Sequence, residues 1–178
     1  MNRRSVLFSY LSILFFVLAT HVGAQAGQSL LKLGDTLPPL AGEGLNGKRV
    51  DVVSDSGGKP AVVVYAFSRA GGHDAQLWSD RLMKDDPHLA IYTVIFLESV
   101  PGMFRGLAVS GIKSGMPVAL LERTIILYRD EDLWKKRLQV GIERNACVML
   151  MNSSSRVEWI TTGPFAEARY AELRRSIR

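Results

Sequence analysis

The most reactive side-chain chemistry available to this chain belongs to its single cysteine, Cys147. It lies in the run ACVMLMN (146–152), where both alternating sets of residues are apolar, so a strand there would be buried on both faces. The thiolate is the nucleophilic form of cysteine, and apolar burial raises the pKa of a thiol. We therefore expect Cys147 to be an inert core residue, with a displaced redox centre as the alternative.

The second candidate for side-chain chemistry is the polar turn SRAGGHD (68–74), which follows a buried apolar run. Ser68, His73 and Asp74 can be combined on paper into a Ser-His-Asp triad. Near-adjacent residues do not easily adopt the relay geometry, however, and no G-x-S-x-G elbow is present. An Asp near the first turn of a helix is the usual capping choice. The turn therefore predicts a helix start, with acid–base catalysis as the less favoured alternative.

The sequence has none of the usual motifs for binding a metal ion or a cofactor. Beyond residue 26 the chain has only two histidines, His73 and His88, and neither a cysteine pair nor an H-E-x-x-H motif. No glycine-rich phosphate-binding fingerprint is present either. We therefore expect no metal and no cofactor.

The first 26 residues have the three parts of a signal peptide. Arg3 and Arg4 precede an apolar run from Val6 to Ala19, and small residues follow up to Ala26. The run is shorter than the ~20 residues that span a bilayer comfortably. We predict cleavage after Ala26 and a periplasmic or secreted protein, with a retained N-terminal membrane anchor as the alternative.

Length and composition indicate one globular domain, because 47% of the 178 residues are hydrophobic and 22% are charged. A single cysteine excludes an internal disulfide framework. Two of the 22 Lys and Arg residues and none of the 17 Asp and Glu residues lie in the predicted signal, so the rest carries a net charge of +3. Because no concentrated basic stripe with interleaved aromatic residues is present, we expect no nucleic-acid partner.

Strand and helix patterns alternate after residue 60. Residues 27–60, rich in Gly, Pro and Asp, are expected to form an extended lead-in with turns. Buried-strand patterns cover 61–68, 89–98 and 123–128, a hairpin covers 146–152 and 156–162, and helical patterns cover about 73–84, part of 101–116, 130–139 and the residues after Pro164. This order predicts an α/β domain over 61–178, with a mixed central sheet flanked by helices and a C-terminal β-hairpin and helix.

Two stretches of the sequence carry a family resemblance. LGDTLPPL followed by NGKRVDV resembles the entry segment of peroxiredoxins and extracytoplasmic thioredoxin-like thiol reductases. VVVYAFSRAGGHDAQLWSDRL and YRDEDLWKKRLQVGIERNACVMLMNSSSRVEWITTGPF resemble the assembly-factor family for the membrane sector of mitochondrial ATP synthase, a thioredoxin-like branch without redox cysteines. The resemblance implies a thioredoxin-like fold.

The resemblance also implies where redox chemistry would lie. Active relatives carry their cysteine in the turn after the first core strand, whereas 68–74 has none, and Asn145-Ala146 replaces the cis-proline of those relatives. Arg144 stands where peroxiredoxins place an arginine that helps to activate peroxide. Cys147 with Arg144 is therefore the candidate for a displaced redox site, although we expect Arg144 to form a structural ion pair.

These observations favour an exported, non-catalytic thioredoxin-like protein that binds another protein, as an assembly or folding factor for a membrane complex. Its expected recognition residues are Ser68, Arg69, His73, Asp74 and an exposed Trp159 on a possible edge strand. The alternative is an enzyme, a divergent thiol-dependent antioxidant or disulfide oxidoreductase.

Overall fold

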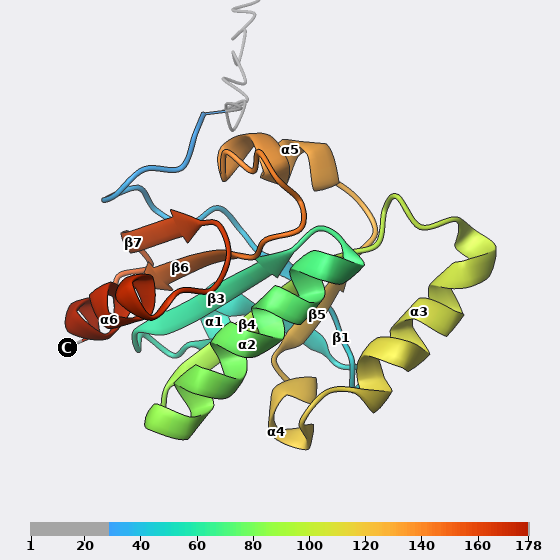
Figure 1. Ribbon diagram of the computed structural model, residues 1–178, viewed down its shortest axis with the longest axis horizontal. Coiled ribbons are helices and arrows are strands. Elements are labelled where there is room, and N and C mark those ends of the chain that lie inside the picture. The colour runs from blue at the N-terminus through green and yellow to red at the C-terminus, as the bar shows by residue number, and fades with distance from the viewer. Residues whose placement is uncertain (1–28, 178) are drawn as a thin grey trace, which may run out of the picture.

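A computed structural model describes residues 29–177 of the chain (Figure 1). The predicted signal peptide, 1–26, lies outside the described residues. The elements, in chain order, are β1 (Ala41–Gly44), β2 (Arg49–Asp51), α1 (Val52–Asp55), β3 (Ala61–Ala66), α2 (Arg69–Asp85), β4 (Ala90–Phe96), α3 (Gly102–Ser114), α4 (Val118–Leu121), β5 (Thr124–Leu127), α5 (Glu131–Arg137), β6 (Cys147–Met151), β7 (Val157–Thr162) and α6 (Glu167–Ser176).

The strands form one mixed sheet in the order β2-β1-β5-β4-β3-β6-β7, which confirms the predicted α/β class. β3, β4 and β5 are parallel, and helices connect them as parallel neighbours require. β6 pairs antiparallel with β3, and β7 completes the predicted hairpin. The ends of β3, β4 and β5, where α2, α3 and α5 begin, therefore share one side of the sheet, called here the carboxyl edge.

Apolar residues alternate along the central strands and supply a core on each face of the sheet. In β3, Val62 and Val64 point to one face, whereas Val63 and Tyr65 point to the other. The first face is covered by α2 and α6, which lie on the same side of the sheet in Figure 1. The second face is covered by α1, α5 and the segment from Leu31 to Leu40. Strands that are buried on both faces explain the continuous apolar runs in the sequence.

The predicted lead-in, 27–60, is more than an extended segment. Residues 41–51 form a β-hairpin whose first strand, β1, pairs antiparallel with β5 and extends the central sheet. One of the turns expected in 27–60 is the hairpin turn at Asn46-Gly47, where Gly47 has a φ of 80° that few other residues adopt. The segment from Leu31 to Leu37 instead runs beside the start of β7, because the amide of Leu37 donates to the carbonyl oxygen of Ser155 at 2.8 Å.

Between residues 29 and 177, no helix combines the length and the hydropathy that crossing a membrane requires.

Candidate functional site

The turn after β3 lies at the carboxyl edge, where the sequence placed the candidate site. Ser68 is the N-cap of α2, because its Oγ accepts a hydrogen bond from the Gly71 amide at 3.0 Å. The same hydroxyl donates to the carbonyl oxygen of Glu143 at 2.6 Å and so holds the loop that precedes β6. Helix α2 thus begins at Arg69, four residues before the predicted start at His73. Ser68 therefore serves the fold rather than a free recognition surface.

Helix α2 has two glycines in its first turn, and a close backbone contact explains the glycine at position 71. A Cβ atom at this position would lie 2.7 Å from the carbonyl oxygen of Glu143, closer than real Cβ contacts allow. Only glycine lets the 142–146 loop approach the helix backbone this closely. Because glycine has a low helix propensity, the predicted helix began only after this pair, at about residue 73.

Asp74 is buried and does not cap its own helix, which corrects the expected capping role. Its carboxylate accepts hydrogen bonds from the backbone amides of Ala146 and Phe165, both at 2.8 Å. These amides lie at the start of β6 and just before α6, 72 and 91 residues further along the chain. Asp74 therefore joins three segments of the fold, and its carboxylate is not available to a partner.

Three candidate residues remain exposed at the carboxyl edge: Arg69, His73 and Arg144. Their side chains form no hydrogen bond or ion pair with any other described residue, so the ion pair expected for Arg144 is not formed within 29–177. Arg69, at the start of α2, and Arg144, in the loop before β6, each follow one partner of the hydrogen bond from Ser68 to Glu143. The exposed part of the predicted site is thus cationic.

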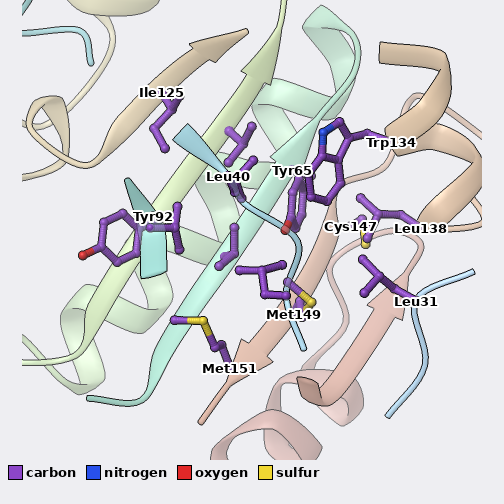
Figure 2. Packing of buried hydrophobic residues seen from close by; sticks show 14 of the residues in the cluster. Leu31, Leu40, Tyr65, Tyr92, Ile125, Trp134, Leu138, Cys147, Met149 and Met151 are labelled. Carbon is purple, nitrogen blue, oxygen red and sulfur yellow. The ribbon is translucent and has the colours of Figure 1, made fainter. Parts of the chain in front are cut away.

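Cys147 is buried in the core on the α5 side of the sheet, as predicted, with 1% of its surface exposed. Figure 2 shows its sulfur among Leu31, Leu138 and Met149. Burial raises the pKa of the thiol well above its ordinary value, and it also raises that of the neighbouring Tyr65 hydroxyl. Because Arg144 is exposed and Cys147 is buried, the two residues do not form an open thiolate site.

A charged network beside the turn was missed in the sequence. The Lys135 ammonium lies 2.7 Å from Glu131 and 2.8 Å from Glu143, and Glu131 is buried. Desolvation opposes the charge on Lys135, but hydrogen bonds to the two carboxylates raise its pKa overall. Glu131 also accepts from the Ser99 amide at 3.2 Å. The i,i+4 spacing of Glu131 and Lys135 was the available signal for this pair.

Trp159 lies on β7, an edge strand as expected, but its indole is half-buried rather than exposed. Its ring centroid is 6.2 Å from that of Trp78, so the side chain packs on the core between the sheet, α2 and α6. It also lines an open groove of about 840 Å³ with Glu158, Glu172 and Arg175. Trp159 is remote from the turn, because that groove includes Pro60, which precedes β3.

Within residues 29–177, no three His, Cys, Asp or Glu side chains gather closely enough to hold a metal ion.

Comparisons with known proteins identify the fold. The sequence matches no protein-family model and no curated protein. Solved structures that resemble this one include the thioredoxin domain of a thiol-disulfide oxidoreductase from Bacteroides vulgatus (TM-score 0.56, 19% identity, 83% of this chain and 99% of that chain), BsSco of the Sco family of cytochrome c oxidase assembly proteins (TM-score 0.55, 10% identity, 84% and 98%), and a thiol peroxidase from Chromobacterium violaceum (TM-score 0.53, 16% identity, 83% and 88%).

These proteins differ in their described activities but share one architecture. Because their sequence identities to this chain are below 20%, the similarity establishes the architecture alone. The turn, the loop before β6 and the buried Cys147 thus belong to a thioredoxin-like fold.

Proposed function

We propose that this chain is an exported, non-catalytic thioredoxin-like protein that binds another protein and assists the assembly or folding of a membrane-associated complex. One observation carries the proposal. The turn after β3 has no thiol, and the single thiol of the chain is buried on the opposite side of the sheet from α2. Nucleophilic thiol chemistry needs an accessible thiolate, which neither position supplies.

The exposed cations at the carboxyl edge indicate the chemistry of the partner. Arg69 is the first residue of α2 and Arg144 lies in the loop before β6, and a hydrogen bond from Ser68 to Glu143 holds the two segments together; neither guanidinium has a partner among the described residues. Arginine binds carboxylates through two parallel hydrogen bonds and is enriched in binding hot spots. An acidic segment of a partner protein would satisfy these cations. The predicted signal peptide supports an encounter outside the cytoplasm.

Site-specific photo-crosslinking in intact cells tests the proposal. A photoreactive amino acid replaces Arg69 or Arg144, and Lys48 is the matched control. Lys48 is an exposed cation in the β1–β2 turn, next to the start of β5 and therefore at the other end of the sheet. We expect the same crosslinked protein from positions 69 and 144 and not from position 48. Equal capture at all three positions, or none at any, would contradict the proposal.

The second candidate is a thiol-dependent oxidoreductase, which the fold similarity to a thiol-disulfide oxidoreductase and a thiol peroxidase favours. It is tested by measuring peroxide and disulfide reduction for the wild type and for Cys147→Ser. We expect equal background rates, because the Cys147 thiol is buried and its pKa is raised. A rate that Cys147→Ser abolishes and that Arg144→Ala lowers would replace the binding proposal with an enzyme.

A further inference from the structure

Strand β7 is one of the two edge strands of the sheet, and no further strand of the described chain lies beyond it (Figure 1). An exposed edge carries unpaired backbone N–H and C=O groups, on which a strand of another chain can pair. The other edge strand, β2, has only three residues, whereas β7 has six. The outer side of β7 is therefore the longer of the two places where this sheet can extend into another molecule.

The start of β7 is already covered by the chain itself. The Val157 amide donates to the carbonyl oxygen of Asp35 at 2.9 Å, and the Val157 carbonyl oxygen accepts from the Gly34 amide at 2.8 Å. Residues 34–37 thus pair with the first part of the edge in the way that an added strand would. An incoming strand cannot use this part of β7.

The far end of β7 is covered by a side chain instead. The guanidinium of Arg169, in the first turn of α6, donates to the carbonyl oxygen of Thr162 at 2.8 Å. The next residue, Gly163, directs its amide to the carbonyl oxygen of Ala146 beside β6. Outward and inward residues alternate along an antiparallel strand, so Thr162 and Ile160 both direct their backbone groups outward. Within residues 29–177, those of Ile160 have no partner.

Gly163 is the residue that admits the Arg169 side chain to this position. Its φ of 130° favours glycine, and a Cβ atom there would collide with the Arg169 guanidinium. Arginine usually pairs with carboxylates through two parallel hydrogen bonds. Arg169 has no such ion pair with any described residue, and its side chain donates to the Thr162 carbonyl oxygen alone. Its described polar contact is therefore the one that covers the edge.

The groups that Arg169 covers are complementary to those of a second copy of the chain. When two β7 strands run antiparallel about a twofold axis at Thr161, Ile160 of each copy lies opposite Thr162 of the other. Each of these pairs exchanges two hydrogen bonds, one of which ends on the Thr162 carbonyl oxygen that Arg169 occupies. Because β7 ends at Thr162, the incoming strand stops short of Val157 and of residues 34–37.

We propose that Arg169 makes an autoinhibitory contact, which keeps the chain from pairing with a second copy of itself through the outer edge of β7. The contact covers the end of the strand that residues 34–37 leave open. This inference rests on β7 and the start of α6 and does not depend on the proposed protein-binding function.

Arg169→Met tests the contact in the full-length chain, because it removes the donor and keeps a long apolar stem. The matched control is Arg175→Met, since Arg175 is exposed on the same helix and its side chain donates only within α6, to Ala171 at 3.3 Å. Each substitution removes one positive charge and adds one methionine. In sedimentation velocity, the average mass of Arg169→Met should rise with protein concentration toward about twice the wild-type value, whereas Arg175→Met should match the wild type.

A second substitution locates the association. Ile160→Pro removes an amide donor that the fold does not use, and proline is tolerated on an edge strand. Added to Arg169→Met, it should restore the wild-type mass at every concentration.

Amide hydrogen exchange of the wild type tests the edge without any variant. The Ile160 amide should exchange at least about tenfold faster than that of Thr161, which faces β6. The proposal is overturned if Arg169→Met sediments like the wild type, if Arg175→Met associates equally, or if Ile160→Pro does not reverse the association. Equal protection of the two amides in the wild type would also overturn it, because the edge would then already be paired.

Discussion

Helices α2 and α3 follow the first two parallel strands of the same sheet, yet they are held in opposite ways. The first turn of α2 is fixed by the Ser68 side chain, and Asp74 ties that end to β6 and to the residues before α6. Helix α3 has no side-chain cap and buries no residue in 102–114. The start of α2 is held by polar side chains, whereas α3 leaves Met103, Phe104 and Leu107 exposed and packs on the core only through partly buried residues.

This difference shows where function can be sought in a thioredoxin-like chain whose turn after β3 has no cysteine and whose single cysteine is buried. The turn after β3 corresponds to the turn that carries the reactive cysteine in redox-active relatives. In this chain, however, Ser68 and Asp74 already form intramolecular hydrogen bonds. The side chains that remain available are those of Arg69, His73 and Arg144 and the exposed apolar residues of α3. Four predictions test the contrast between a tightly held and a weakly held helix.

The largest effect is expected for Asp74→Ala. The substitution leaves the amides of Ala146 and Phe165 without their acceptor, and each buried unsatisfied donor costs about 1–3 kcal/mol. We expect the free energy of unfolding to fall by about 2–4 kcal/mol in urea denaturation. Asp80→Ala, at an exposed position of the same helix, should change it by less than about 0.5 kcal/mol. Equal effects would mean that the buried carboxylate does not hold α2.

Gly71→Ala should destabilise the protein next most strongly, by about 1–3 kcal/mol. The new methyl group would lie 2.7 Å from the carbonyl oxygen of Glu143, and that backbone atom moves only with its loop. Thermal unfolding measures the effect. An unchanged or higher Tm would show that the 142–146 loop yields easily and that Gly71 is not required there.

Gly106→Ala is the matched substitution in α3, and it should have the opposite sign. Its methyl group meets no atom within 4 Å, so replacing glycine inside the helix should stabilise the protein by about 0.5–1 kcal/mol. The same unfolding experiment measures it. A loss of stability would show that α3 packs more closely than its exposure indicates, and the contrast with α2 would fail.

The smallest effect concerns pH at the other end of α2, where the Tyr170 hydroxyl donates to Asp85 at 2.7 Å. Burial, and then this hydrogen bond, raise the pKa of Tyr170 to about 12 from 10.0. The folded state thus holds the phenol proton more tightly than the unfolded state, so the resulting stability is complete below about pH 10 and lost as the pH rises toward 12.

Urea denaturation at several alkaline pH values checks this dependence. The free energy of unfolding should decline with pH more steeply in the wild type than in Tyr170→Phe, which has no phenol proton to lose. Parallel curves for the two proteins would exclude Tyr170 as the source of the decline.

The central fold could be predicted because buried strands leave a clear pattern in the sequence. The apolar runs at 61–68 and 146–152 correspond to β3 and β6, and the apolar stripe of Ala75, Trp78 and Leu82 is buried. The β1 strand was not predicted because AGEG has no strand pattern of its own. It forms because β5 offers it an edge, which is a tertiary effect.

The candidate site was predicted in position but only partly in role. Residue type suggested that Asp74 caps its helix, whereas its two partners lie 72 and 91 residues away, where no local pattern reveals them. Cys147 was correctly expected to be buried, because its neighbours on both sides are apolar. The half-burial of Trp159 depends on Trp78 in another element, and sequence alternation along one strand does not report such packing.

The segment that seals the core over Cys147 receives its support late in the chain. The Arg156 side chain donates to the carbonyl oxygen of Gly34, which lies 122 residues earlier in the chain. The Leu31 amide donates to the carbonyl oxygen of Arg137. Synthesis delivers the N-terminus first, so the Gly34 carbonyl has no Arg156 to accept from until most of the polypeptide has been made. A product that terminates before Arg156 lacks both Arg156 and β7. The segment from Leu31 to Leu37 would then have lost most of the hydrogen bonds that hold it over the core around Cys147.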